Sequence, residues 1–591
     1  MTADVLSLTL KSGIQRDGTL FDSPMFVDGQ WVRFQRGRPR KMGGYRGIFL
    51  NAPSISRGMV MQSQQGINYV YSGFYDSVKY WQTDDDDGVG SGPTSVTVTG
   101  LVSNATNLWQ FDIGFNAAQT ALQVVAHAGQ NLKYIDNAVN TKVFSGNFPG
   151  GTMTAVGVFS LTGSAGTPDA VTIVINSADY RIGVNQTVSG TGVTTGTKVT
   201  AVTVVTTPSP KTTVTVDTAI SGTSSVAFTF DNNISVSGGC VMVYPYLFVY
   251  GNSGLIQNCA AGDFTNWISA DSNANNVSAT KVVKGLPLRG GTTSPAALFW
   301  SLDQVTRVSY APQTVGTSTI YWRYDIISTQ SSILSSQSVI EYDGIYYWCG
   351  VDRFLMYNGV VQEIANNVNI NFFFDNLNFA QRQKVWAAKI PRWGEIWWFY
   401  PSGDSVECNN AIILNLREQT WYDAGFAPGA ARSAGTFSEV FKYPIWAENT
   451  SNTTNNYTIW QHETGTDSIY LTNVDAIESF FETNCIGWVT GGPGQNTIKG
   501  LNRWMRIERV EPDFVQSGEM SVVVTGKGYA DDVDAPSAPY TFQPDTLKVD
   551  MREQRRELRL RFISNTAGGN YETGNVLISA DIGDERSTGN P

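Results

Sequence analysis

Apolar and aromatic residues recur along this chain in short runs that alternate with polar residues and are broken by Gly, Asp or Asn. Alternation over about four to eight residues predicts half-buried β-strands, and a polar pair between two such runs predicts the turn of a β-hairpin. Seven segments show this unit, and they span residues 67–81, 122–136, 246–259, 296–310, 345–359, 396–416 and 445–461. The pattern therefore predicts a succession of antiparallel hairpins over most of the chain.

A succession of small antiparallel sheets is typical of a β-propeller, in which each sheet forms one blade. We expect an all-β protein with a β-propeller over residues 49–465, preceded by an N-terminal arm over residues 1–48. No WD or kelch motif marks the repeats, so the pattern leaves the number of blades open. A string of β-sandwiches is the competing fold.

Two further segments depart from the hairpin pattern. Residues 151–231 contain few large aromatic residues and are rich in Gly, Thr and Val. Valines that alternate with polar residues favour a small β-domain inserted into the propeller over a Ser/Thr-rich linker. Towards the C-terminus, the segments 504–514, 520–529, 557–565 and 575–584 predict the strands of a β-sandwich domain over residues 466–591.

Residues 369–389 have the spacing of a helix. Side chains three or four positions apart share one face of a helix, and here these are Phe379, Gln383, Trp386 and Lys389. Asp375 or Asn376 has the side-chain type that caps a helix N-terminus. We therefore expect a helix in this segment, with its aromatic residues in the core.

Basic residues gather in two places. The first is the strip 17–46, in which Pro39, Gly43 and Gly44 disfavour a helix. Aromatic residues interleave with the charges there, so the strip is either a solvated extended arm or an arm docked on an acidic neighbour. The second is the run 551–562, where arginines that alternate with apolar residues favour ion pairs across a sheet, with a subunit interface as the alternative. Both clusters are candidate protein-interface residues: Arg33, Arg36, Arg38, Arg40, Lys41, Arg552, Arg555, Arg556, Arg559 and Arg561.

Composition narrows the class of protein. The chain has 591 residues, of which 41% are hydrophobic and 12% aromatic, enough for several cores. A net charge of −11 disfavours a general nucleic-acid binder, which usually carries a basic surface. The five cysteines form no CxxC pair, so we expect reduced core thiols in a protein that folds in the cytoplasm. No signal-peptide core and no apolar run of membrane-spanning length occur, and we expect no membrane segment.

The sequence offers little catalytic chemistry. Its two histidines, His127 and His462, are far apart, and none of the motifs HExxH, GxSxG, GxxxxGK[ST] and GxGxxG occurs. Carboxylates could serve a glycosidase, but neither 269–276 nor 401–408 matches the Ser-x-Asp-x-Gly-x-Thr-Trp box of sialidase propellers. The four aspartates at 84–87 lack EF-hand spacing, and we interpret them as a solvated loop tip. We expect no enzymatic activity, no cofactor and no metal site.

Four segments resemble the packaged-DNA stabilisation, or tail-hub (nozzle), proteins of short-tailed bacteriophages. They are FVDGQWVRFQRGRPRKMGGYRG at 26–47, the stretch 262–312, the hairpin and helix of 338–378, and the stretch 395–425 with the Arg-rich domain that follows it. The resemblance covers most of the chain except 151–231. It is carried by a succession of patterns, with no short diagnostic motif.

The resemblance implies a structural protein of the virion tail, assembled in the host cytoplasm. It implies a homo-oligomeric ring, expected to be a hexamer, below the portal and adaptor rings. The ring would retain the packaged DNA and conduct it through its lumen without sequence-specific contact. A tail needle or plug would meet its distal surface, and tail fibres or spikes its sides.

Two alternatives stay open at this stage. The first is a phage receptor-binding or glycan-cleaving tail appendage, for which a trimer and a pocket lined by carboxylates would be the signs. The second is a bacterial propeller enzyme or carbohydrate-binding protein, which as a secreted protein should carry a signal peptide.

Overall fold

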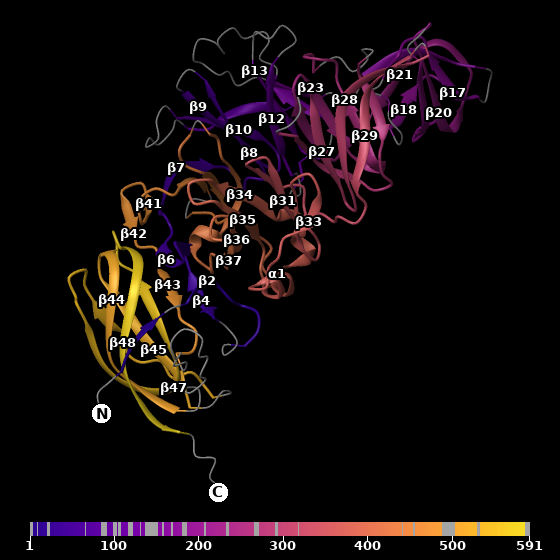
Figure 1. Ribbon diagram of the computed structural model, residues 1–591. Helices are drawn as coiled ribbons and strands as arrows, with labels where there is room; N and C mark the ends of the chain where they lie inside the picture. The colour runs from indigo at the N-terminus through magenta and orange to yellow at the C-terminus, as the bar shows by residue number, and fades with distance from the viewer. Residues whose placement is uncertain are drawn as a thin grey trace.

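A computed structural model gives the fold of this chain, and strands are its dominant secondary structure (Figure 1). It describes residues 4–8, 10–19, 24–64, 67–83, 92–98, 103–104, 108–115, 122–129, 132–135, 152–155, 159–166, 170–179, 182, 186–205, 208–231, 236–264, 271–289, 294–316, 318–439, 441–452, 456–486, 503–528 and 532–585.

The central part of the molecule is a ring of four-stranded antiparallel units, the blades of a β-propeller. Blades 1 and 2 consist of β8 (Met59–Gln64), β9 (Ile67–Gly73), β10 (Val78–Thr83) and β11 (Thr94–Val98), then β12 (Gln110–Phe115), β13 (Leu122–His127), β14 (Leu132–Ile135) and β15 (Thr152–Ala155). Blades 3 and 4 consist of β22 (Gly239–Val243), β23 (Tyr246–Tyr250), β24 (Leu255–Asn258) and β25 (Asn273–Asn276), then β26 (Val282–Pro287), β27 (Ala296–Ser301), β28 (Val305–Val315) and β29 (Ser318–Ser328).

The remaining blades complete the ring. Blades 5 and 6 consist of β30 (Val339–Tyr342), β31 (Ile345–Cys349), β32 (Phe354–Tyr357) and β33 (Val361–Glu363), then β34 (Trp386–Ile390), β35 (Glu395–Tyr400), β36 (Asn410–Asn415) and β37 (Thr420–Asp423). Blade 7 consists of β38 (Arg432–Thr436), β39 (Ile445–Glu448) and β40 (Tyr457–His462), and its outer strand is the N-terminal β7 (Tyr45–Ala52). The described residues thus form seven blades, a number that the sequence pattern left open.

The first strands of the blades line the axis, and contacts between neighbouring first strands close the ring. Neighbouring first strands contact each other from β38 to β8, β12, β22 and β26, and from β30 to β34 and β38. Between blades 4 and 5 the contact is a shared core that contains Trp300 and Trp348. Because β7 comes from the N-terminal side of blade 1, it ties the last blade to the first. The predicted β-propeller fold is confirmed.

Aromatic packing between blades explains why the strands of blade 6 have no polar face. All six residues of β35, Glu395–Tyr400, are buried. Successive side chains of a strand point to opposite faces, so Trp397 packs towards one neighbour and Trp398 towards the other. Both faces of an inner blade are covered, which replaces the alternating pattern by a continuous apolar run.

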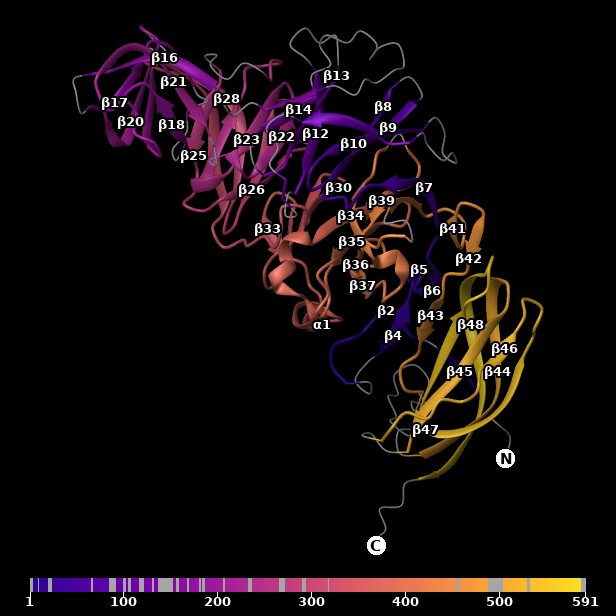
Figure 2. The same cartoon turned by 180° about the vertical axis from the view of Figure 1, so that it is seen from behind.

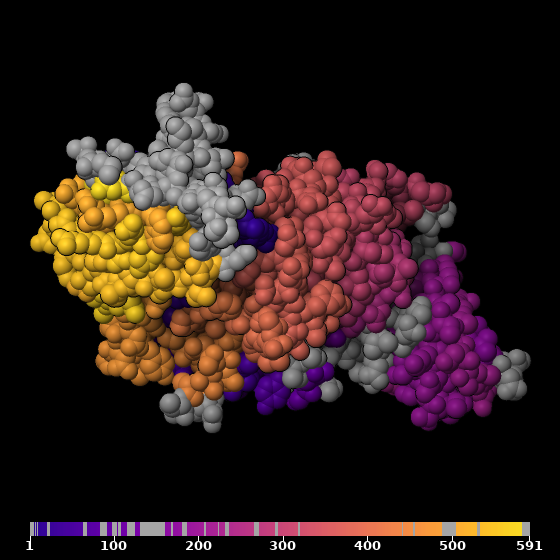
Figure 3. Space-filling view, turned by 90° about the horizontal axis from the view of Figure 1, so that it is seen from below, coloured from indigo at the N-terminus to yellow at the C-terminus, as the bar shows by residue number. Residues whose placement is uncertain are grey.

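The inserted domain is a separate six-stranded sheet at one end of the molecule (Figures 1 and 3). Its strands are β16 (Phe159–Ala165), β17 (Ala170–Ile175), β18 (Thr187–Gly190), β19 (Val199–Val205), β20 (Lys211–Ile220) and β21 (Thr223–Asp231). It has its own core, which includes Ile173, Val214 and Phe228. The sheet begins at residue 159, whereas the sequence placed its start at 151, because residues 152–155 pair with β14 in blade 2.

The C-terminal domain is a β-sandwich at the opposite end of the molecule (Figures 2 and 3). Its strands are β43 (Ser479–Glu482), β44 (Arg503–Ser517), β45 (Met520–Lys527), β46 (Tyr540–Phe542), β47 (Val549–Ser564) and β48 (Asn570–Glu585). The long strand β47 pairs with β44 through residues 549–555 and with β45 and β43 from Arg556 onward, so it belongs to both layers. Residues 468–475, which the sequence assigned to this domain, form the hairpin β41 (Ser468–Tyr470) and β42 (Asn473–Asp475) beside β7 of the propeller.

The N-terminal arm does not stand apart from these domains. Its strands are β1 (Asp4–Leu8), β2 (Lys11–Ile14), β3 (Met25–Phe26), β4 (Asp28–Gln30), β5 (Val32–Gln35) and β6 (Arg38–Lys41). Strands β1 and β6 pair with β48, and β4 pairs with β43, so most of the arm is part of the C-terminal sandwich. Strand β2 lies against β37 of blade 6.

The helix predicted over residues 369–389 is wrong in extent. The α-helix α1 covers only Ile370–Asn376, and a 3-10 turn follows at Phe379–Lys384. The N-cap is Asn369, whereas Asp375 and Asn376 lie in the last turn. Trp386 and Lys389 belong to β34, whose five pairs with β35 override the helical spacing.

Candidate functional site

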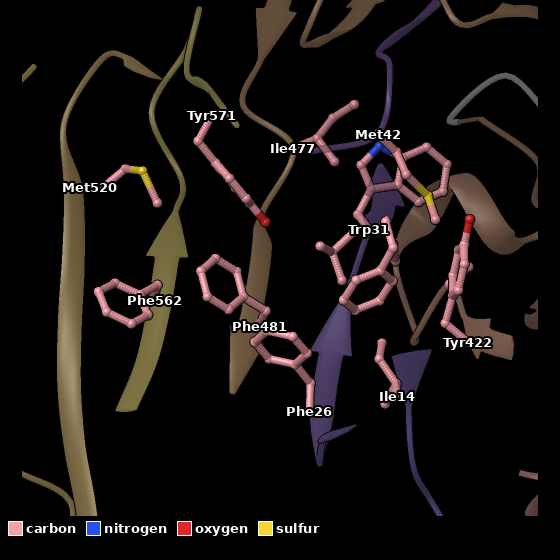
Figure 4. Close-up of a cluster of buried hydrophobic side chains, with 14 of the residues drawn as sticks. Ile14, Phe26, Trp31, Met42, Tyr422, Ile477, Phe481, Met520, Phe562 and Tyr571 are labelled. Carbon is pink, nitrogen blue, oxygen red and sulfur yellow. The ribbon is translucent and has the colours of Figure 1, made fainter. Parts of the chain in front are cut away.

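The aromatic anchors of the arm lie between the propeller and the C-terminal sandwich (Figure 4). Trp31 is 1% exposed and meets Trp397 of blade 6 edge-on, with ring centroids 6.0 Å apart. Phe26 meets Phe481 of the C-terminal domain edge-on at 5.6 Å. One continuous apolar core therefore joins the arm to both domains, and we call this contact region the arm junction.

Arg33 is the central charge of the arm junction. Its guanidinium donates to both carboxylate oxygens of Glu463, at 2.6 and 2.7 Å, and its Nε lies 2.9 Å from Glu395 Oε1. The side chains of Arg33 and Glu395 are 1% and 0% exposed. Glu395 also accepts hydrogen bonds from Trp397 Nε1 and from the Tyr422 hydroxyl. An ion pair this deeply buried ties the arm to blade 6 and to the residue after blade 7.

The two carboxylates around Arg33 respond differently to burial. Burial raises the pKa of Glu395, and the nearby Arg33 charge offsets this only in part. Burial acts on Glu463 as well, but the charge and hydrogen bonds of Arg33 outweigh it and hold the pKa of Glu463 below its ordinary value. Glu463 is therefore the carboxylate whose ionised form the arm stabilises most.

Lys41 and Arg40 continue the arm junction towards the C-terminal domain. Lys41 is 2% exposed and donates from Nζ to the Gly569 carbonyl at 2.8 Å. Burial lowers the pKa of Lys41 to about 8, against the opposing effect of Asp467. Arg40 pairs with Glu572 at 3.1 Å.

Arg36 and Arg38 lie at the outer edge of the arm. Arg36 and Gly37 are the two turn residues between β5 and β6, and both have positive φ, 53° and 73°. This is the backbone of a two-residue hairpin turn, and it points the Arg36 side chain into solvent. Arg38 is partly exposed and donates to Asn575.

The arm is thus docked on acidic residues of its own chain. Most of its basic side chains form ion pairs or hydrogen bonds within the same chain. The same holds for much of the C-terminal cluster. Arg559 is 4% exposed and binds Glu482 at 2.6 Å and Asp534 at 2.7 Å, which confirms ion pairing across the sheet. Arg561 lies 3.5 Å from the centroid of the Phe480 ring, and Arg556 lies over Trp504. Contact with another protein stays a prediction, and the cluster residues with solvent exposure are Arg36, Arg38, Arg40, Arg552, Arg555 and Arg561.

Side-chain amides join blades around the axis of the propeller. Gln337 donates from Nε2 to the carbonyls of Arg57 and Trp109, at 2.8 and 3.0 Å, and so joins blade 5 to blades 1 and 2. Gln110 donates to the carbonyls of Gly238 and Val283, at 2.8 and 3.1 Å, and so joins blade 2 to blades 3 and 4. The Gln337 bonds join blades on opposite sides of the ring, and the Gln110 bonds join successive blades.

Two cavities lie along the axis. One, of about 320 Å³, is at the start of the first strands and has Lys281 and Arg382 in its lining. The other, of about 280 Å³, is at their ends and has Arg289, Glu341 and Lys389 in its lining. Glu341 lies 3.6 Å from Arg289 and 3.5 Å from Lys389, so the second cavity holds a carboxylate between two cations.

The cavity linings were not predicted from the sequence. Glycosidases use two carboxylates, and Glu341 is the one carboxylate among the described lining residues of both cavities. The cations come from different blades, and only closure of the ring places them around one space. No spacing along the chain signals this arrangement.

The other potentially reactive side chains are buried in blades. All five cysteines are free and buried, and burial raises the pKa of Cys259 to about 12. His462 accepts a hydrogen bond from Arg432 Nε at 3.0 Å, and burial together with that charge lowers the pKa of His462 well below its ordinary value. His127 lies in β13 of blade 2, away from β40 and His462.

Among the described residues, no three or more His, Cys, Asp or Glu side chains gather in a group that could hold a metal ion. No helix of the described chain is long and apolar enough to cross a membrane. The aspartates at 84–87 lie outside the described residues.

Comparison with known proteins finds loose structural likeness. No protein-family model and no curated protein matches this chain. Among solved structures, a phage phi92 endosialidase is similar over 85% of this chain and 75% of that chain, with a TM-score of 0.28 and 10% identity. An exo-beta-1,3-galactanase from Phanerochaete chrysosporium covers 91% of this chain and 100% of its own, with a TM-score of 0.24 and 10% identity. At these scores the functional argument rests on the residues of this chain.

Proposed function

We propose that this protein is a structural subunit of a bacteriophage tail hub. In this proposal, copies of the chain form a ring, a hexamer, below the portal and adaptor rings. The ring retains packaged DNA and conducts it outward during ejection. The observation that carries the proposal is the arm junction, in which Trp31 and Arg33 fasten the propeller to the C-terminal sandwich.

A subunit that bears load between other proteins must transmit force without hinging. Interfaces between domains of one chain are often small and polar, so relative motion is the usual expectation. Here the arm contributes strands to the C-terminal sheet and packs its core against blade 6, while β7 completes blade 7. These contacts favour a single rigid wedge of the kind that packs into a closed ring.

The path of DNA in this proposal is the lumen between subunits. Within each propeller, Gln337 joins blades on opposite sides of the ring, so a side chain bridges the axis at that level. The chain carries a net charge of −11, and a wall of that sign would limit the phosphate contacts that trap DNA. Sequence-specific recognition has no part in this function.

We further propose that the protein is not an enzyme. The alternative, a glycan-cleaving tail appendage, needs two carboxylates placed about the scissile bond. In the second cavity the one carboxylate among the described lining residues, Glu341, lies between Arg289 and Lys389, and no second carboxylate stands beside it. A non-catalytic role in the virion fits this lining better.

Ring assembly is tested in solution with the exposed arginines. The double variants Arg36→Ala/Arg38→Ala and Arg552→Ala/Arg555→Ala are compared with Arg323→Ala, an exposed arginine of blade 4. Mass measurement by light scattering, with negative-stain imaging, should show a closed ring for the wild type and the control and a loss of rings in at least one double variant. A wild-type monomer or trimer that degrades surface polysaccharide at substoichiometric amounts would overturn the proposal.

A further inference from the structure

The larger axial cavity, of about 320 Å³, lies where the chain enters the first strands of blades 2 to 6. Lys281 precedes β26, and Arg382 is in the 3-10 turn before β34. Ser336 precedes β30, and Gln110, which joins successive blades, is part of the wall. Five blades thus contribute to one space.

Both cations of this cavity lack an acidic partner among the described residues. Among the described residues no carboxylate forms an ion pair with Lys281, and burial alone acts on its pKa. The Arg382 guanidinium lies over the Phe379 ring at 4.7 Å. Asp303, which is not among the described lining residues, accepts a hydrogen bond from the Thr280 hydroxyl.

The two axial cavities therefore differ in charge. In the smaller one, Glu341 offsets part of the charge of Arg289 and Lys389. In the larger one, the described lining residues include two cationic side chains, Lys281 and Arg382, and no carboxylate. This is unusual in a chain whose overall net charge is −11.

An unpaired lysine in such a place is costly for the folded state. Burial lowers the pKa of Lys281, which means that its surroundings disfavour the charged form. An apolar residue of similar length would avoid this cost. A cation kept against a cost of this kind is typical of a site that binds an anion.

We propose that this cavity binds a phosphomonoester with a small polar body, such as a sugar phosphate. A phosphate group of this kind carries a charge of about −1.5 to −2 at neutral pH, which matches two cations, whereas a carboxylate would leave one uncompensated. The planar fork of Arg382 can donate two parallel hydrogen bonds to phosphate oxygens.

The rest of the lining suits the body of such a ligand. Gln383 and Ser336 offer uncharged hydrogen-bond donors for hydroxyl groups. Leu302 and Ile333 supply apolar contact surface. The volume exceeds that of a phosphate ion alone, so a sugar ring has room beside it. This site does not depend on the tail-hub proposal.

Calorimetric titration of the full chain with four compounds tests the site. Glucose 6-phosphate should bind, inorganic phosphate should bind more weakly, and glucose and glucuronate should bind at least about tenfold more weakly than glucose 6-phosphate. A short DNA carrying a 5′-phosphate, compared with the same strand without it, shows whether a nucleic-acid end is the source of the phosphate. Equal binding of glucose and glucose 6-phosphate would overturn the proposal.

The variant Lys281→Met gives two readouts of opposite sign. It should weaken glucose 6-phosphate binding about 10- to 100-fold, because a charge-assisted hydrogen bond is lost. It should also raise the melting temperature of the unliganded protein, because an unpaired, partly buried charge is removed. Lys389→Met, in the smaller cavity, is the matched control and should leave binding unchanged. A Lys281→Met protein that binds as the wild type does, or one that is destabilised without ligand, would contradict this site.

Discussion

Removal of the Arg33 guanidinium is the sharpest perturbation of the arm junction. In Arg33→Met the stem of the side chain keeps its length, but Glu395 and Glu463 lose the charge that pairs them. Removing one partner of a buried ion pair typically costs about 3–5 kcal/mol, because the other charge stays buried without compensation. Glu395 is fully buried, so we expect a loss of free energy of unfolding in this range.

Such a loss is a large part of the stability of a typical domain, which is about 5–15 kcal/mol. Urea unfolding followed by tryptophan fluorescence measures it, since Trp31, Trp393 and Trp397 all lie at the arm junction. Limited trypsin digestion gives a second readout, because a loosened arm exposes more of its backbone. The variant should unfold at lower urea and lose its arm faster than the wild type.

Arg36→Ala is the matched control in the same arm. The Arg36 side chain is exposed at a turn, and surface changes of this kind usually alter stability by no more than about 0.5 kcal/mol. If Arg33→Met costs less than about 1 kcal/mol, the value of an exposed ion pair, then the arm junction does not hold the two domains together.

The pH dependence of the same variant follows from Glu463. The folded-state pKa of Glu463 is depressed, so its ionised form stabilises the wild type above its unfolded pKa, about 4.3. That stability is lost as the pH falls through the lower folded-state pKa. Arg33→Met has already lost it, so the difference between the two proteins should narrow below about pH 4. A difference that stays constant from pH 7 to pH 3 would contradict the assigned role of Glu463.

Three further predictions concern other parts of the fold. Replacing residues 159–231 by a short Gly/Ser linker should leave the rest of the protein soluble with a cooperative melt. Phe159 and Phe230 are paired at the base of the insertion, so a short linker can span the gap. Aggregation of the shortened protein would count against this. Native protein should resist a thiol reagent at pH 8 and react fully in denaturant, since burial raises the pKa of its cysteines; rapid native labelling would refute it. The folded-state pKa of His462 is lowered, so the unfolded chain binds a proton there that the folded protein does not, and wild-type stability should fall as the pH drops below about 6.5. The variant His462→Gln should reduce that fall. Identical pH profiles of stability for the two proteins would exclude the effect.

The blades could be predicted from the sequence because their signals are local. A hairpin such as 345–359 contains both strands and the turn between them, and its partners lie a few residues away. Closure of the ring involves β7 and β40, which are far apart in sequence, and no local pattern marks that pairing. The helical spacing at 379–389 misled for the same reason, because Trp386 pairs with Phe399 in a sheet.

For the charged sites too, the local sequence signal was visible and the distant partners were not. The density of arginines around Arg33 and Arg559 was visible in the sequence, but their partners Glu463 and Glu482 were not, because each lies on a distant element. Lys281 and Arg382 line the same cavity only because five blades meet there. Sequence patterns identify which residues carry charge, and topology decides what the charge faces.

The central claim is that this chain is a ring-forming subunit on the axis of a phage tail. Electron microscopy of the assembled particle, with the protein located by an antibody against the inserted domain, tests it most directly. We expect a six-fold ring of label below the portal, around the path of the DNA. Label confined to trimeric appendages at the periphery of the tail would contradict the account.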